Sequence, residues 1–350
     1  MKILVSALEH SANVHLKSLK NELHKDTEFI GIFDNSLGKP IVDLRSLAIM
    51  GIVDALKKLR FFFKLADEMV ELSREADKVL LIDSSGFNLP LAKKIKKKYP
   101  DKEIIYYILP QAWAWKKKRI PVLARTIDHL CSILPFEPAY YPKGAPIEYV
   151  GHPLLDQIKE FKEHEVQKIE HITFMPGSRK GEIKRLMPIF KELREMLREI
   201  KKATVIIPEY FSQEEIGELY GDLSAFEIVH NAHKTLHEAD FAFICSGTAT
   251  LEAALIGTPF ILAYKAKALD YFIGSRVVKL SHVGLANIMF EKFRKEEIHP
   301  EFLQDAVTAE NLFKSYKDYD TSHFLENSKA LREYLQHGSS KRVAEIIERS

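Results

Sequence analysis

Short runs of apolar and β-branched residues alternate with longer stretches of helical periodicity along most of the chain, and this alternation constrains the fold most. Strands are expected at residues 2–7, 28–32, 79–83, 103–108, 129–134 and 147–150, and again at 172–175, 204–207, 227–229, 241–245 and 259–263. Strands that alternate with helices in this way build parallel sheets covered by helices on both faces. We therefore predict an α/β fold, and beyond residue 265 the pattern predicts helices only.

The length of the chain favours two domains of this kind. The 350 residues, 46% of them hydrophobic, are enough for two packed cores. We predict a first doubly wound, Rossmann-like domain over residues 1–153 and a second over residues 154–321, with helices of residues 322–350 joining the first domain. Residues 154–171 are interpreted as a linker with a surface helix. Ligands of such sheets bind beyond the carboxyl ends of strands, so the expected site is a cleft between two facing domains.

Two strand–turn–helix segments of the second half have the composition of phosphate-binding turns. In residues 173–185, TFMPGSRKGEIKR, the turn includes Gly177 and Ser178, and Arg179 adds a guanidinium. The unpaired N–H groups at a helix start and an Arg side chain both suit an anion. The alternative is an ordinary turn with an exposed Arg. The same design recurs in residues 244–259, ICSGTATLEAALIGTP, where the turn contains Ser246, Gly247 and Thr248.

Several classes of function are excluded by what the sequence lacks. It contains no GxGxxG, GxxxxGK[ST], HExxH or GxSxG motif, and its net charge of +2 gives no reason to expect nucleic-acid binding. The spacing of His230, His233 and His237 fits surface histidines better than a metal site, and the only D-x-D, Asp318–Asp320, fits helix capping better. We therefore expect no metal. Two cysteines in apolar runs and an N-terminal apolar run too short for a signal peptide predict a reducing, cytoplasmic compartment.

The first half contains one candidate for acid–base chemistry and one for membrane contact. Asp83 ends an apolar strand and precedes a Ser-Ser-Gly loop, so it is a candidate base, although a helix cap is the alternative. Residues 47–65 mix apolar side chains with Lys and Arg, which suits a helix at an anionic membrane surface, although a core helix with a basic outer face is the alternative. The apolar residues concerned are Ile49, Met50, Ile52, Val53, Phe61, Phe62 and Phe63.

A series of motifs resembles one family over nearly the whole chain. They read IMGIVDAL from residue 49, LIDSSGFN from 81, YILPQAWAWKKKR from 107, LPFEPAYY from 134, VGHPLLD from 150, MPGSRKGEI from 175, SGTATLEAALIGTPFILAYK from 246, GLANIM from 284 and HPEFLQ from 299. Their content and order are similar to those of the lipid-A-disaccharide synthases, which are glycosyltransferases of the GT-B fold.

This resemblance implies a reaction and roles for individual residues. A 2,3-diacylglucosamine unit would pass from its UDP conjugate to 2,3-diacylglucosamine 1-phosphate, giving a β-1,6-linked disaccharide 1-phosphate and UDP at the inner face of the inner membrane. An α-linked donor and a β-linked product mean inversion, which needs a base, here Asp83. Arg179 would hold the diphosphate and Glu252 the ribose, and no metal or other cofactor is implied. Asn287, Glu301 and Gln304 would line the donor site.

One departure from the family pattern leaves alternatives open. Where the family has a GEASGD turn after the first strand, residues 8–13 read LEHSAN, which keep Glu9 and Ser11 but neither glycine. Glu9 is therefore a second candidate base. The alternative functions are another UDP-sugar enzyme of the GT-B fold, a transferase or an epimerase, and a non-catalytic protein that binds lipid or nucleotide. A homodimer is left open.

Overall fold

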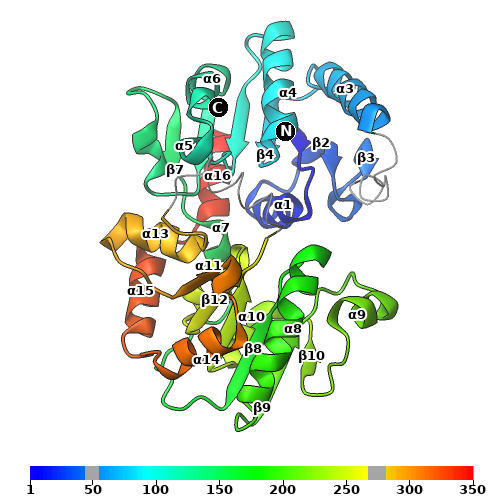
Figure 1. Cartoon of the computed structure of the whole chain (residues 1–350). Helices are drawn as coiled ribbons and strands as arrows, with labels where there is room; N and C mark the ends of the chain where they lie inside the picture. The colour runs from blue at the N-terminus through cyan, green and yellow to red at the C-terminus, as the bar shows by residue number, and fades with distance from the viewer. Residues whose placement is uncertain (44–54, 267–280, 350) are drawn as a thin grey trace. The chain divides into compact units, whose positions relative to one another are not determined.

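The computed structural model describes residues 1–43, 55–266 and 281–349, which form two compact units (Figure 1). The first unit contains Met1–Gln157 and Leu335–Ser350, and the second contains Ile158–Tyr334. The chain therefore passes into the second unit close to the predicted boundary at residue 153. It returns at Leu335, later than the predicted residue 322, because the helix before this point packs within the second unit.

The first unit is built on a seven-stranded parallel sheet in the order β3-β2-β1-β4-β5-β6-β7. Its strands are β1 (Lys2–Ser6), β2 (Glu28–Phe33), β3 (Val42–Asp43), β4 (Lys78–Ile82), β5 (Ile104–Tyr107), β6 (His129–Ser132) and β7 (Ile147–Tyr149). Its helices are α1 (His10–Glu22), α3 (Ala55–Leu72), α4 (Ser85–Lys98), α5 (Ala112–Trp115), α6 (Ile120–Thr126), α7 (Pro153–Gln157) and α16 (Ser339–Glu348), with short 3₁₀ turns η1 (Asn35–Leu37), η2 (Lys117–Arg119) and η3 (Glu137–Tyr140).

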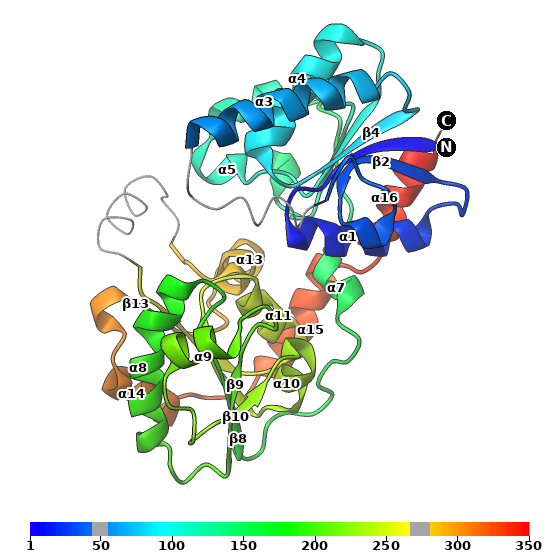
Figure 2. The ribbon, with the colours of Figure 1, turned by 90° about the vertical axis from the view of Figure 1, so that its right-hand side faces the viewer.

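Successive residues of the central strands enter two different cores, one on each face of this sheet. In β4, Val79 and Leu81 belong to the core beneath α3, α4 and α6, whereas Leu80 and Ile82 belong to the core beneath α1 and α16. Figure 2 shows α3 and α4 on one face of the sheet and α1 and α16 on the other. This alternation explains why the strand reads as a continuous apolar run, since both of its faces are buried.

The second unit is built on a six-stranded parallel sheet in the order β10-β9-β8-β11-β12-β13. Its strands are β8 (His171–Met175), β9 (Lys202–Ile206), β10 (Glu227–Val229), β11 (Phe241–Cys245), β12 (Phe260–Tyr264) and β13 (Glu301–Leu303). Its helices are α8 (Lys180–Met196), α9 (Gln213–Tyr220), α10 (Ala232–Glu238), α11 (Thr248–Ile256), α13 (Leu285–Arg294), α14 (Ala309–Lys317) and α15 (Phe324–Leu335), with η4 (Gln304–Ala306).

The sequence-based prediction of the strands is confirmed for the long apolar runs and wrong at two sheet edges. β3 and β13 were not predicted: β3 has only two residues, and β13 lies beyond residue 265, where the pattern was interpreted as helices only. The surface helix expected within residues 154–171 is also absent: α7 ends at Gln157, and no further helix precedes β8 in this described stretch. None of the helices in the described part of the chain is both long and apolar enough to span a membrane.

Candidate active site

Asp83 lies at the carboxyl end of β4, where the backbone turns sharply. Its N–H still donates to the carbonyl of Tyr107 on β5 at 3.1 Å, so the sheet continues to this residue. Asp83 and Ser84 then both adopt left-handed φ angles, 50° and 42°. The carbonyl of Asp83 accepts hydrogen bonds from the Tyr106 hydroxyl at 2.6 Å and from Asn88 Nδ2 at 2.9 Å. Left-handed non-glycine residues persist only where the surroundings enforce them, and such positions are frequent at functional sites.

The structure brings the two candidate bases of the first unit together. Glu9 is the exposed N-cap residue of α1, and its Oε1 accepts a hydrogen bond from Ser84 Oγ at 3.1 Å. Burial raises the pKa of Asp83, the negative charge of Glu9 raises it further, and the Ser84 backbone N–H partly opposes both. Asp83 is therefore a stronger base than an ordinary aspartate, as a proton acceptor requires.

The first candidate phosphate-binding turn of the second unit connects β8 to α8. Gly177 has a φ of 105°, a left-handed conformation that favours glycine. Arg179 is the N-cap residue of α8, and its backbone N–H donates to Glu182 Oε2 at 3.4 Å. The Arg179 side chain is 82% exposed, and its Nη1 lies 3.3 Å from Glu182 Oε1. Tyr210 steadies the turn by donating its hydroxyl to the carbonyl of Ser178 at 2.6 Å. The guanidinium can therefore reach a ligand in solvent from a well-anchored turn.

The second turn, between β11 and α11, lies beside the first. β11 pairs directly with β8 in parallel, so both turns leave the same edge of the sheet. The proximity is direct: a β-carbon on Gly177 would lie 3.2 Å from the Cys245 sulfur. Gly247 and Thr248 are exposed at the start of α11, and Ser246 Oγ donates to the carbonyl of Val283 at 3.2 Å. Two helix N-termini and one exposed Arg thus lie at neighbouring turns of one sheet edge, an arrangement suited to a diphosphate.

Glu252 lies on α11 in surroundings that disfavour its charge. Its side chain is 15% exposed, and burial raises its pKa to about 7. His233 on α10 is its basic neighbour, with 3.8 Å between His233 Nε2 and Glu252 Oε2. Burial lowers the pKa of His233. The sequence indicated Glu252 as a ligand-binding residue but missed His233, which was interpreted as a surface histidine because periodicity does not reveal which helices pack together.

Asn287 and Glu301, both expected to line the donor site, are bonded to the protein itself. Asn287 is fully buried; its Nδ2 donates to the carbonyl of His299 and to Glu301 Oε1, each at 2.9 Å. The Glu301 carboxylate also accepts the N–H groups of Val283 at 2.8 Å and Gly284 at 3.1 Å. These two side chains therefore hold the start of α13, including the Val283 carbonyl that receives Ser246, rather than presenting free polar atoms.

Gln304 differs from these two neighbours. It follows β13 with a left-handed φ of 53°. Its Nε2 is buried and has no hydrogen-bond partner among the residues that the structure describes. A buried amide without an acceptor is costly. Gln304 is thus the member of this group with an unused donor.

Comparison with known proteins decides the family. The sequence profile of the lipid-A-disaccharide synthetases matches residues 3–349. The chain is 49% identical to the lipid-A-disaccharide synthase of Helicobacter acinonychis, over 99% of this chain and 97% of the relative. It is 48% identical to that of Campylobacter jejuni, over 98% of each chain. The chain belongs to the lipid-A-disaccharide synthase family. It is accordingly a glycosyltransferase of lipid A biosynthesis, which makes the lipid A disaccharide.

Solved structures show that the chain has the GT-B fold. The UDP-GlcNAc 2-epimerase of Neisseria meningitidis, solved with UDP-GlcNAc bound, matches with a TM-score of 0.60 at 12% identity, over 99% of each chain. The glycotransferase of kitacinnamycin matches with a TM-score of 0.59 at 14% identity, over 99% of this chain and 97% of the other. Because epimerases and transferases share this fold, it does not itself distinguish their reactions.

The aromatic residues of the motif from residue 107 and of α3 occupy different surroundings. Trp113 is buried and packs edge-on against Phe136, with 4.9 Å between ring centroids, so it is a core residue. Phe62 is partly buried and contacts Phe87 at 5.9 Å between centroids, whereas Phe63 is 56% exposed. α3 packs on α4, so that of the three phenylalanines Phe63 is exposed and Phe61 and Phe62 are partly buried; their contact with a membrane stays a prediction. The predicted contacts Ile49, Met50, Ile52 and Val53 lie outside the described residues.

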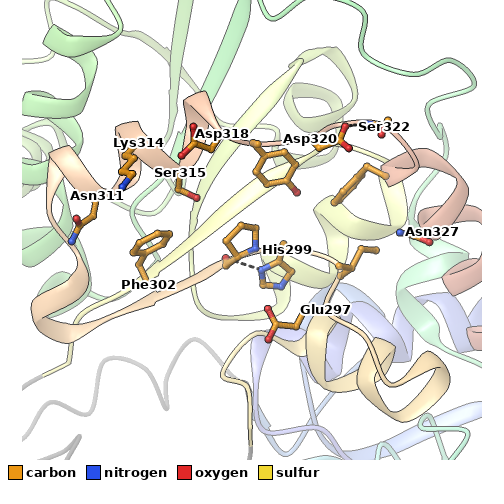
Figure 3. A pocket seen from close by; sticks show the side chains of 14 residues that line it. Glu297, His299, Phe302, Asn311, Lys314, Ser315, Asp318, Asp320, Ser322 and Asn327 are labelled. Carbon is orange, nitrogen blue, oxygen red and sulfur yellow. Dashed lines mark hydrogen bonds between the residues drawn. The ribbon is translucent and has the colours of Figure 1, made fainter.

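A separate hollow in the second unit is lined by the two acids of the D-x-D motif, among other residues (Figure 3). It has a volume of about 630 Å³ and is lined by the segment entering β13 and by parts of α14 and α15. Asp318 occupies the C-cap position of α14, and Asp320 Oδ1 accepts the Ser322 N–H at 2.9 Å in the turn between α14 and α15, rather than at the start of a helix as the sequence predicted. Figure 3 shows that the two carboxylates do not converge. In the described ranges no three His, Cys, Asp or Glu side chains are arranged to hold a metal.

Proposed function

We propose that the chain transfers 2,3-diacylglucosamine from its UDP conjugate to the 6-hydroxyl of 2,3-diacylglucosamine 1-phosphate, with inversion at the anomeric carbon. One observation carries this proposal. The turns that follow the paired strands β8 and β11 both lead into helix N-termini, and the Arg179 side chain at the first turn is exposed to solvent. This arrangement provides the positive potential that a departing diphosphate needs.

In the second unit, the donor would be bound through its UDP part. Arg179 would donate to the diphosphate oxygens, and the backbone N–H groups after Gly177 and Gly247 would complete the anion site. The hydroxyls of Ser246 and Thr248 lie at the same turn. Glu252 follows Thr248 by four residues, which corresponds to about 6 Å along a helix. We assign Glu252 to the ribose hydroxyls, because that spacing suits the next part of a nucleotide.

In the first unit, Asp83 would act as the general base. The acceptor's 6-hydroxyl gives its proton to the Asp83 carboxylate while its oxygen forms the bond to the donor's anomeric carbon. The bond between that carbon and the UDP oxygen breaks, and UDP leaves with the electron pair. Burial and the neighbouring Glu9 both raise the pKa of Asp83, which improves its ability to take the proton. No metal or other cofactor takes part in this proposal.

The remaining candidate residues would act at the donor site in two ways. Asn287 and Glu301 would keep the start of α13 in place, so that the Val283 carbonyl can orient Ser246. Gln304, whose Nε2 lacks a partner among the described residues, would donate to the donor sugar or its phosphate.

Membrane contact would bring the enzyme to its lipid substrates. Phe63 is exposed beside Arg60 and Lys64 on α3, and Lys94 Nζ lies 5.8 Å from its ring centroid. We call Arg60, Phe63, Lys64 and Lys94 the Phe63 surface. An apolar ring among cations suits anionic lipid headgroups. We place the enzyme on the inner face of the inner membrane, held peripherally.

Mass spectrometry of the products tests the reaction. Purified protein with both lipid substrates should give a disaccharide 1-phosphate and UDP in equal amounts. Conversion of the UDP-sugar without an acceptor, by epimerisation or hydrolysis, would contradict the proposed transfer.

A further inference from the structure

We propose that His233 is the proton acceptor of Glu252, and that it leaves this carboxylate ionised when the ribose of the donor nucleotide binds. His233 would thus be a positioning residue, acting on the nucleotide through Glu252. The inference rests on the proposed function, since it requires Glu252 to bind the ribose. It adds a role for His233 that neither the motifs nor the fold assigns.

The geometry places the two side chains together at the nucleotide turn. Glu252 is the only charged residue of α11, whose other side chains are largely buried. α10 contacts α11, and His233 Nε2 lies 3.8 Å from Glu252 Oε2. Both side chains retain some exposure, 34% for His233 and 15% for Glu252, so a ligand can reach the carboxylate. A shift of about 1 Å brings this separation to hydrogen-bond length.

Among the groups around Glu252, His233 is placed to accept its proton. Burial raises the pKa of Glu252 to about 7, and within the described residues His233 is the basic group that lies within 4 Å of its carboxylate. Strands β11 and β12, which flank α11, have no Asp, Glu, Lys, Arg or His side chain. The other titratable groups on packed elements are Cys245 on β11, Tyr264 on β12, Lys234, His237 and Glu238 on α10, Glu291, Lys292 and Arg294 on α13, and His171 on β8.

The chemistry requires a proton to leave Glu252. A protonated carboxyl offers one donor, whereas two ribose hydroxyls need acceptors, which the ionised form supplies. Near neutral pH the free protein holds a proton on Glu252 for part of the time. When the ribose hydroxyls bind, that proton moves from Glu252 Oε2 to His233 Nε2. The resulting carboxylate offsets the burial that lowers the pKa of His233 in the free protein. No proton has to pass to solvent.

Calorimetric titration with UDP tests this transfer. Binding is measured between pH 6 and 8.5, in pairs of buffers with different ionisation enthalpies, which reports the protons released. The parent should release few protons near pH 7. His233→Gln should release up to about one proton, and its UDP affinity should fall below pH 7 by up to about tenfold per pH unit.

His237→Gln is the matched control. His237 lies one turn later on α10, and its Nδ1 is also 3.8 Å from a glutamate oxygen, that of Glu160, which is 72% exposed. This variant should behave as the parent. A His233→Gln protein with the parent's proton count and pH profile would overturn the inference. A uniform loss of affinity at every pH would also overturn it, because it would mean direct contact or a structural role.

Glu252→Gln separates the inference from the proposed function. If this variant binds UDP as tightly as the parent, the assignment of Glu252 to the ribose is wrong whatever His233 does. If it binds weakly while His233→Gln matches the parent, only the role of His233 fails. Melting temperatures of all variants establish that they are folded.

Discussion

The carboxylate of Glu182 lies against Gly177: a β-carbon on this glycine would be 2.7 Å from Glu182 Oε2. The contact explains why the turn before α8 needs glycine for two reasons, its left-handed φ of 105° and the absence of space. The two oxygens of this carboxylate accept from the backbone N–H and the guanidinium of Arg179, which fixes the Arg179 end of the turn.

Gly177→Ala should therefore damage the turn and weaken UDP binding. Backbone strain of this kind costs about 1–3 kcal/mol, which corresponds to roughly tenfold to a hundredfold in affinity if the turn cannot reach its binding geometry. Calorimetry with UDP provides the measurement. Gly217→Ala is the control, because it lies within α9 with open space around its β-carbon, and should raise stability by about 0.5–1 kcal/mol. Equal UDP affinity in both variants would contradict the prediction.

Asp83→Asn should lower kcat by about a hundredfold to ten-thousandfold, the usual contribution of a general base. UDP affinity and melting temperature should change little, since the variant keeps the shape of the side chain and lies outside the second unit. Steady-state kinetics with both lipid substrates would check this. A variant that turns over within a few-fold of the parent but melts much lower would make Asp83 a structural residue, and Glu9 would then be the next candidate.

Glu9→Gln should shift the acid limb of the pH–rate profile. Activity is lost as pH falls through the pKa of Asp83, which lies above its ordinary value because of burial and because of the charge on Glu9. Removing that charge should move the limb to lower pH while keeping most of kcat. A profile of kcat against pH for both proteins is the measurement. An unchanged limb together with a large loss of kcat would identify Glu9 as the base instead.

Glu137 should make stability depend on pH. This residue of η3 is buried, accepts one hydrogen bond from Ser132 Oγ, and has its pKa raised by burial to about 7. A raised pKa means that its stabilising contribution is complete below its ordinary pKa of 4.5 and is lost as pH rises through about 7. Between pH 4.5 and pH 8 the free energy of unfolding of the parent should therefore fall by about 3 kcal/mol relative to that of Glu137→Gln, which has no carboxyl group to ionise at this position.

Urea unfolding of the parent and of Glu137→Gln at pH 5 and pH 8 measures this difference. The exposed Glu75 supplies a control, since Glu75→Gln should show the parent's pH dependence. If the free energy of unfolding of Glu137→Gln falls between pH 5 and pH 8 as much as that of the parent, ionisation of the buried Glu137 does not cause the pH dependence of stability.

Phe63→Ser should release the protein from anionic vesicles without lowering its melting temperature. Withdrawing one exposed aromatic ring from lipid removes about 1.5–3 kcal/mol, or roughly tenfold to a hundredfold in partitioning. Phe62→Ser should lower the melting temperature and leave vesicle binding nearly unchanged, because the Phe62 ring packs between Phe61 and Phe87 within the unit. Co-sedimentation with anionic and neutral vesicles distinguishes the two. Unchanged binding by Phe63→Ser would exclude the Phe63 surface as the membrane contact.

The success of the sequence-based predictions depended on how local each signal was. β4 and β11 were predictable because every residue of their cores is apolar, and the turns after β8 and β11 were predictable because glycine and the N-terminal end of a helix are local features. β13 was missed because its three residues carry no strand pattern of their own; it is recognised as a strand only through its hydrogen-bonded pairing with β12. The bonding of Asn287 to Glu301, and the approach of His233 to Glu252, arise where distant segments meet, so spacing along the chain could not reveal them.

The position of α16 has a consequence for the order in which the protein can mature. Val343 and Ile347 of this helix are fully buried with Leu16 and Leu19 of α1, and the Tyr107 hydroxyl lies 2.8 Å from Ser339 Oγ. The helix that closes this core is synthesised only after the whole second unit. On the ribosome, the second unit can therefore finish folding before the first. Until α16 is synthesised, one face of the sheet of the first unit stays partly uncovered, and chaperones can bind this apolar surface.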